Sequence, residues 1–143
     1  MFLLGDINDT VYEYSLSTAF DSSTISYTSR SLDFSAKEDT PRGISFNATG
    51  TKLFITGQQN DDILEYDLST GFNLSTATFN GAFDVSSYAD KPTDIIFNND
   101  GSKAFLARAS SNGIQSFSLS SPYSFVDITG EYTGDVIDTT SSS

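Results

Sequence analysis

The residues that could do chemistry in this chain are carboxylates and a few cations, gathered in short polar stretches between apolar runs. One set of them falls in stretches that we expect to be loops on one face of the fold, where binding residues are usually carried. Together they could hold a sugar or a segment of another protein, although solvated turns would have the same composition. They are Lys37, Glu38, Asp39, Arg42, Tyr88, Asp90, Lys91 and Arg108.

Two acidic clusters raise the question of a metal site. One cluster contains Asp6 and Asp9, and the other contains Asp61 and Asp62. Their carboxylates offer the oxygen ligands that Ca²⁺ prefers. An Asn-Asp pair in a tight turn explains the same residues, because both side chains tolerate a left-handed backbone. No calcium-type loop with a closing glutamate follows either cluster. We therefore predict no metal site, and these four aspartates are the only candidates for one.

Residues for acid–base or nucleophilic catalysis do not stand out. The chain has no histidine and no cysteine, which removes the imidazole base and the thiolate nucleophile. Glu13 and Glu65 occupy equivalent places in two copies of an internal repeat, which marks a feature of the repeat rather than a unique acid–base pair. Catalysis requires a constellation that breaks the repeat. We therefore predict no catalytic residues and no cofactor.

The charge of the chain restricts its partners. At a formal net charge of −12 it is strongly acidic, whereas nucleic-acid binding needs Lys and Arg to displace phosphate counterions. We expect no nucleic-acid partner, and an anionic membrane is disfavoured for the same reason. No apolar run approaches the roughly 20 residues that span a bilayer, so we expect no membrane insertion. An acidic surface stays soluble at high salt, which is compatible with a saline or extracellular setting.

The polar stretches are spaced by an internal repeat. The segment from Phe2 to Thr24 matches the segment from Phe54 to Thr76 at twelve of 23 positions, an offset of 52 residues. The segment 41–52 matches 92–103 at an offset of 51, and a more divergent third copy of the first segment covers 105–120. Agreement in register at two offsets identifies a true repeat.

Each unit divides into four strand-like pieces. In the most complete unit these are Gly43–Phe46, Lys52–Thr56, Ile63–Leu68 and a piece near Thr76–Val85, and Gly50 supplies the positive φ that the first turn needs. Helical periodicity is absent. A parallel β-helix has shorter repeats, and a sandwich lacks this self-similarity. Four antiparallel strands in about 50 residues is the layout of a β-propeller blade.

The repeat resembles a known class of propeller. The pattern Pro-x-Gly-Ile-x-Phe-Asn-x-x-Gly-Thr-Lys-Leu-Phe-Ile at Pro41 to Ile55 resembles YVTN, NHL and lactonase-like propeller repeats. The continuation Glu-Tyr-Asp-Leu-Ser-Thr-Gly-Phe at Glu65 to Phe72 is similar to repeats of bacterial surface proteins and of phage structural or tail-associated proteins. This resemblance weakens after about Pro122. It implies the fold, but propellers of this class include lactonases, lyases, scaffolds and adhesins, and the enzymes commonly use a histidine, which this chain lacks.

We therefore predict an all-β partial β-propeller of about three four-stranded antiparallel blades, with about 11 strands in all. Blade 1 covers residues 1–40 and lacks its first strand, blade 2 covers 41–91, blade 3 covers 92–137, and a flexible tail covers 138–143. Closed propellers have about four to eight blades, and the edges of an unfinished one invite pairing. We expect either a homo-oligomer, in which two copies give a ring of six blades, or a part of a longer propeller.

These features predict a non-catalytic recognition or assembly module of an extracellular or virion-associated protein, such as a phage structural or tail protein. It would bind a glycan or a protein through its loops and complete its ring by self-assembly. The alternative is a propeller enzyme of the lactonase or lyase kind, with a site completed by other blades or chains.

Overall fold

A computed structural model describes residues 1–110, 113–125 and 136–138 of the chain. Within these ranges it contains eleven β-strands and two short 3-10 helices. The strands form three separate antiparallel sheets, which confirms the predicted all-β partial propeller. In the part of the chain that is described, no helix has the length and apolar character needed to cross a membrane.

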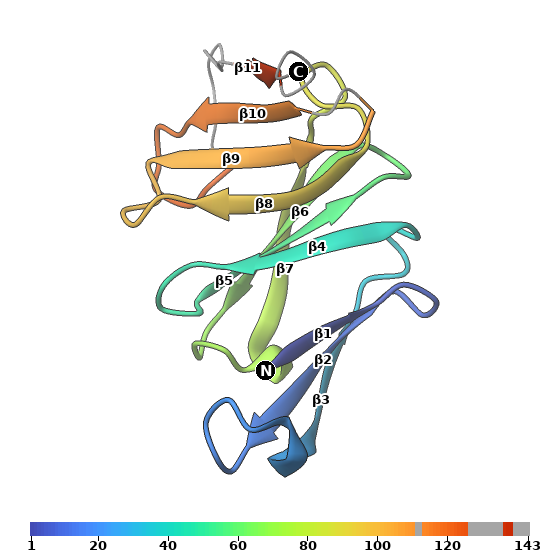
Figure 1. Ribbon diagram of the computed structural model, residues 1–143, viewed down its shortest axis with the longest axis vertical. Helices are drawn as coiled ribbons and strands as arrows, with labels where there is room; N and C mark the ends of the chain where they lie inside the picture. Colours follow the sequence, from blue (N-terminus) through green and yellow to red (C-terminus); the bar gives the residue numbers. More distant parts are fainter. Residues whose placement is uncertain (111–112, 126–135, 139–143) are drawn as a thin grey trace.

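The three sheets follow one another along the long axis of the molecule (Figure 1). We call them blade 1, blade 2 and blade 3. Blade 1 contains β1 (Phe2–Gly5), β2 (Thr10–Leu16) and β3 (Ile25–Asp33), with η1 (Ser22–Thr24) before β3. Blade 2 contains β4 (Pro41–Phe46), β5 (Lys52–Gly57), β6 (Asp62–Leu68) and β7 (Ala77–Asp84), with η2 (Leu74–Thr76) before β7. Blade 3 contains β8 (Pro92–Phe97), β9 (Lys103–Arg108), β10 (Gly113–Ser118) and β11 (Val136–Asp138).

Local turn chemistry sets the strand boundaries. Gly50 ends the turn between β4 and β5 with φ of +69°, a conformation that suits glycine because it has no Cβ. Asp9 and Asp61 adopt φ of 48° and 51° in the equivalent β1–β2 and β5–β6 turns, as expected for aspartate in a tight turn. The predicted flexible tail covers residues 138–143. Its first residue, Asp138, ends β11, and residues 139–143 lie outside the described residues.

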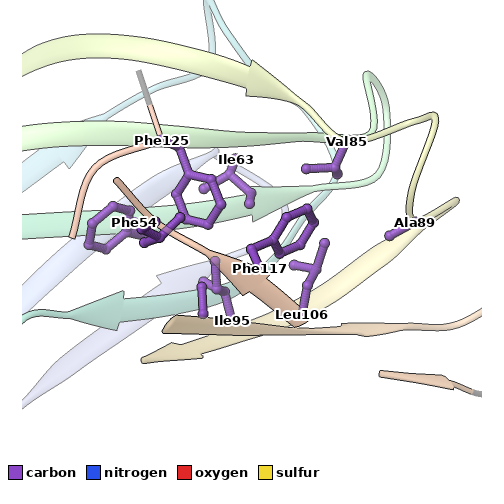
Figure 2. Close-up of a cluster of buried hydrophobic side chains, with 10 residues drawn as sticks. Phe54, Ile63, Val85, Ala89, Ile95, Leu106, Phe117 and Phe125 are labelled. Atoms are coloured by element: carbon purple, nitrogen blue, oxygen red, sulfur yellow. The ribbon is translucent and has the colours of Figure 1, made fainter. Parts of the chain in front are cut away.

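Apolar side chains fill both junctions between neighbouring blades. Val11 and Phe34 of blade 1 pack with Leu53, Ile55 and other residues of blade 2. At the next junction, side chains of blade 2 interleave with those of blade 3 (Figure 2), and they include Phe54, Ile63, Val85, Ile95, Leu106, Phe117 and Phe125. The inner strands of blade 2 are therefore buried on both faces, unlike a sheet with one solvated face.

A buried glutamate links each blade to the next. Glu13 Oε2 on β2 accepts a hydrogen bond of 3.1 Å from the backbone N–H of Leu74 in blade 2. Glu65 Oε2 on β6 accepts one of 3.0 Å from the backbone N–H of Phe125 in blade 3. These contacts are equivalent in the repeat, because Glu65 follows Glu13 by one unit and Phe125 follows Leu74 by one unit. We call this contact the glutamate link.

The second oxygen of each glutamate is satisfied within its own blade. Glu13 Oε1 pairs with the Arg30 guanidinium at 2.7 Å, and Glu65 Oε1 accepts from the Lys52 ammonium and from Asn80 Nδ2. Burying a carboxylate is costly unless it is paired and hydrogen-bonded, and both glutamates meet this condition. The structure thus gives the repeated glutamate a role in joining blades.

We expect Glu65→Ala to lower the free energy of unfolding by about 3 kcal/mol. The substitution leaves the buried N–H of Phe125 without an acceptor, and it removes one of the two carboxylates that pair with the Lys52 ammonium. Asp67→Ala is the matched control, since Asp67 pairs with the same Lys52 but its side chain is 51% exposed. We expect it to cost less than about 1 kcal/mol. Urea unfolding measures both values, and equal losses would contradict a special role for Glu65.

Candidate functional site

Several loops meet at one end of the first junction, between blades 1 and 2. Because antiparallel strands alternate in direction, the β1–β2, β3–β4 and β5–β6 loops lie at the same end of their sheets. Arg42, at the start of β4, joins two of them. Its Nη1 donates to Asp6 Oδ1 at 2.9 Å, and its Nε donates to Gln58 Oε1 at 3.2 Å.

The β3–β4 loop inserts Glu38 beneath this surface. Glu38 is fully buried, and its Oε1 accepts hydrogen bonds from the backbone N–H groups of Thr40 at 2.7 Å and Gln59 at 3.0 Å. A Cβ added to Gly57 would lie 2.1 Å from the carboxyl carbon of Glu38. The Glu38 carboxyl group therefore occupies the space that a larger residue at position 57 would take. Its other oxygen, Oε2, has no hydrogen-bond partner among the described residues.

Asp62 lies directly across from Gly57 in the register of β5 and β6. Residues opposite one another in an antiparallel pair project to the same face, so the Asp62 side chain lies beside the Glu38 carboxyl group. Asp62 is only 8% exposed, and its Oδ1 has no hydrogen-bond partner among the described residues. The structure thus holds two buried carboxyl groups together, each with an unpartnered oxygen. We call them the Glu38–Asp62 pair.

This environment changes the proton affinity of Asp62. Burial, followed by the charges of Glu38, Asp84 and Asp61, raises the pKa of Asp62 from 3.8 to about 6. Desolvation and nearby like charges both disfavour the ionised form. A carboxyl group with such a pKa can take up or release a proton close to neutral pH, which is the property required of a general acid or base.

The Glu38–Asp62 pair breaks the repeat. At the equivalent places of the second junction, between blades 2 and 3, the chain has Ala89 and Gly113. The position of Gly57 is taken there by Arg108, whose guanidinium donates to the backbone carbonyl of Tyr88 at 3.2 Å. Among the described residues, the equivalent positions of the second junction therefore hold no carboxyl pair.

The predicted loop residues do not converge on a single site. Lys37, Glu38, Asp39 and Arg42 lie at the first junction, and Tyr88, Asp90, Lys91 and Arg108 lie at the second. The Lys37 ammonium lies 3.8 Å from the centroid of the Phe79 ring, and the Asp39 carboxylate accepts from the Thr40 hydroxyl. The Tyr88 ring packs against Phe117 in the core at 5.7 Å.

Sequence reasoning named Glu38 as a loop residue and Asp62 as a metal candidate, but it did not bring them together. It did not include Gln58, which accepts a hydrogen bond from Arg42 Nε, among the candidate site residues. The available signal was the departure from the repeat, because the positions of Glu38 and Asp62 hold Ala89 and Gly113 one unit later.

Two of the four aspartates considered for a metal have partners of their own. Asp6 pairs with Arg42, and Asp61 Oδ1 accepts from the backbone N–H of Lys91 at 2.8 Å. Asp9 has a buried oxygen, Oδ1, without a partner. Across residues 1–110, 113–125 and 136–138, no group of three or more His, Cys, Asp or Glu side chains is arranged to hold a metal ion.

Comparison with known proteins supports the fold. The chain matches no family model and no curated protein. It is similar in structure to a protein of Bacteroides fragilis named "putative 6-phosphogluconolactonase", with a TM-score of 0.65, 16% identity and coverage of 96% of this chain and 35% of that one. A protein of Bacteroides uniformis with the same name gives a TM-score of 0.54, 17% identity and coverage of 80% and 34%. A functionally unknown protein of Desulfotomaculum acetoxidans gives a TM-score of 0.57 at 17% identity, with coverage of 80% of this chain and 32% of that one.

These structures also correct one prediction from the sequence. This comparison contradicts the prediction that the chain is not an enzyme, because two of the similar structures carry the name of a lactonase. The absence of histidine was a weak argument, since a carboxyl group with a raised pKa can also transfer protons. The chain spans about a third of the length of the structures it matches.

We expect the Glu38–Asp62 pair to make stability depend on pH. Because the pKa of Asp62 is raised from 3.8 to about 6, the folded state holds this proton more tightly than the unfolded chain does. The stabilisation is complete below the unfolded value and is lost as the pH rises through about 6. Asp62→Asn, which resembles the protonated form, should raise the thermal midpoint at about pH 7.5 and change it little at about pH 4.

The control for this prediction is Asp90→Asn, which removes an exposed carboxylate elsewhere on the loop face. Thermal unfolding followed by circular dichroism at both pH values measures the effect. If Asp62→Asn raises the thermal midpoint by the same amount at both pH values, the prediction is wrong.

Proposed function

We propose that the chain is part of a propeller hydrolase that opens the lactones of sugar acids, and that the Glu38–Asp62 pair is its acid–base group. The observation that carries this proposal is the pair itself, in which a nearly buried aspartate has its pKa raised to about 6. The names of two similar structures support the reaction class.

The reaction needs a proton to move in both directions. A water oxygen attacks the lactone carbonyl carbon while the Asp62 carboxylate takes the proton that the water loses. The ring C–O bond then breaks, and the same carboxyl group returns the proton to the departing oxygen. The product is an open hydroxy acid, and Asp62 is again ionised. General acid–base catalysis of this kind contributes about 10²–10⁴-fold in rate.

The two carboxyl groups have different parts in this scheme. Asp62 keeps 8% of its surface exposed and is the member that can touch a substrate, whereas Glu38 is fully covered. Glu38 is a positioning residue, whose charge raises the proton affinity of Asp62. Its own place is held by the two backbone N–H groups that donate to Oε1.

Arg42 is suited to bind an anionic substituent of the substrate. Its ion pair with Asp6 is exposed, with 38% of the Arg42 side chain and 65% of the Asp6 side chain accessible. Exposed pairs of this kind contribute only about 0–1 kcal/mol. A phosphate or carboxylate can therefore replace Asp6, and the planar guanidinium favours such groups.

Further blades would complete the ring around this site. They could belong to a longer chain or to other copies of this one, so self-assembly through edge strands stays a prediction. The extracellular or virion-associated setting and a glycan or protein ligand also stay predictions from the sequence. Sedimentation velocity over a range of protein concentrations would decide the self-assembly.

The proposal is tested by hydrolysis of the δ-lactones of gluconate and 6-phosphogluconate, corrected for the spontaneous rate. We expect Asp62→Asn to lower kcat about 100-fold, because it removes the proton acceptor. Asp90→Asn is the control and should leave kcat unchanged. An Asp62→Asn variant with full activity, or a wild-type protein without activity on either lactone, would contradict the proposal.

We expect Arg42→Ala to act on substrate binding rather than on the chemical step. It should raise KM for the phosphorylated lactone by about tenfold, and it should leave KM for the unphosphorylated lactone nearly unchanged, because only the former has an anion to bind. Steady-state kinetics with both substrates measure this difference. An equal effect on both would show that Arg42 does not recognise the anion.

A further inference from the structure

One arginine at the second junction has no acidic partner. The chain contains three arginines. Arg30 pairs with Glu13 at 2.7 Å, and Arg42 pairs with Asp6 at 2.9 Å. Arg108, the last residue of β9, forms no ion pair with any carboxylate of the described residues. Its positive charge is therefore not balanced locally, although the chain has a formal net charge of −12.

The protein uses only part of the Arg108 guanidinium. Its Nη1 donates to the backbone carbonyl of Tyr88 at 3.2 Å, which is its one acceptor in the part of the chain that is described. Its Nε is buried and has no hydrogen-bond partner among the same residues. A guanidinium carries five N–H donors in a rigid planar fork. The edge formed by Nε and Nη2 is therefore unused.

The Arg108 side chain projects into the second junction. Side chains alternate along a strand, so Arg108 lies on the same face of β9 as Leu106, which belongs to the core between blades 2 and 3. The residue opposite Arg108 in the register of β9 and β10 is Gly113, which has no side chain. The carbonyl that Arg108 reaches belongs to the β7–β8 loop. The guanidinium thus lies where this loop meets the end of β9.

The places that hold carboxyl groups at the first junction hold small residues here. Ala89 and Gly113 are the equivalents of Glu38 and Asp62. Neither can pair with the guanidinium of Arg108. The Arg108 residue is partly exposed, although its Nε is buried. A ligand can therefore approach the guanidinium from the loop face.

Blade 2 also contributes an unused polar group to this junction. Thr56 lies two residues after Phe54 on β5, so its side chain points to the same junction as the Phe54 ring. Thr56 is fully buried, and its Oγ1 has no hydrogen-bond partner among the described residues. The equivalent positions in blades 1 and 3 hold Leu4 and Ala107. Because buried polar groups are normally hydrogen-bonded, polar atoms left over on both sides of one junction indicate a binding site.

We propose that Arg108 binds the carboxylate group of a small organic acid. The two carboxylate oxygens accept hydrogen bonds from Nε and Nη2, which is the bidentate geometry that a guanidinium favours. One guanidinium balances one negative charge, and the acidic surface of the chain repels a phosphate dianion more strongly than a singly charged carboxylate. The site goes beyond the proposed hydrolase function, because it lies at the second junction and uses neither Asp62 nor Arg42.

The test follows the Nε–H signals of the arginines in nitrogen–proton NMR spectra of the intact protein. Arg108→Lys identifies the Arg108 signal by its loss. Titration with sodium gluconate at about pH 7, with ionic strength held constant by sodium chloride, should shift this signal saturably with a Kd of about 1 mM. The Arg30 signal is the internal control and should not shift, because Arg30 is already paired with Glu13.

Calorimetry measures the contribution of Arg108 in protein that carries Arg42→Ala. This background removes the anion site of the proposed hydrolase, so a failure of one proposal is distinguishable from a failure of the other. Adding Arg108→Gln should weaken gluconate binding at least about tenfold, because the bidentate contact is lost. Adding Lys103→Gln is the matched control, since it removes the same charge from an exposed residue of the same strand. It should leave the affinity unchanged.

The thermal midpoint of the Arg108→Gln variant shows whether it folds, and the NMR titration tests the proposal on unchanged protein if it does not. No shift of the Arg108 signal up to about 20 mM gluconate overturns the proposal. A shift of equal size with sodium chloride alone also overturns it, because it reports screening and not a bound carboxylate. Equal affinities with and without Arg108→Gln have the same meaning.

Acetate and inorganic phosphate complete the test. Acetate carries the carboxylate without further groups, so it should shift the Arg108 signal with a higher Kd than gluconate. If phosphate shifts this signal saturably and neither carboxylate does, the site recognises phosphate and the proposal is wrong.

Discussion

The buried carboxylate of Glu65 is the contact on which the arrangement of the blades depends. Apolar packing pulls neighbouring sheets together without specifying how they are aligned, because it has no direction. A buried charge adds direction, since each of its oxygens must have a donor. Glu65 bonds to Lys52 and Asn80 in its own blade and to the Phe125 backbone in the next. Glu13 repeats this one blade earlier, so the same geometry sets both junctions.

The candidate site depends on the first of these junctions. The Glu38 carboxyl group is enclosed where the connection from blade 1 meets the β5–β6 loop of blade 2, above Gly57. A small rotation between the blades would expose it to water and lower the proton affinity of Asp62. The Asp62 carboxylate is unfavourable for folding at neutral pH, because burial and the charges around it disfavour its ionised form.

Much of the fold could be predicted from the sequence, but the environment of its polar residues could not. Because side chains alternate along a strand, Glu65 of β6 lies on the face opposite Leu64 and Tyr66. A single strand does not show that another blade covers that second face, which buries Glu65 completely. The loop residues were grouped by a shared face, yet Arg42 and Arg108 belong to different junctions. The non-enzymatic interpretation rested on the absence of histidine and did not consider a change in carboxyl environment.

The sequence alone determined the repeat, the strands, the turns and the propeller blades, because these follow from local backbone preferences and from self-similarity at a constant offset. The equivalence of Glu13 and Glu65 was also visible there. Only the tertiary structure decided that Glu38 of the β3–β4 loop and Asp62 at the start of β6 share a buried space beside Gly57. Only the structure showed that Arg108 lacks, among the described residues, a carboxylate partner of the kind that Arg30 and Arg42 have. The physical reason is that burial and proton affinity depend on which distant segments pack together, and a local pattern does not contain that information.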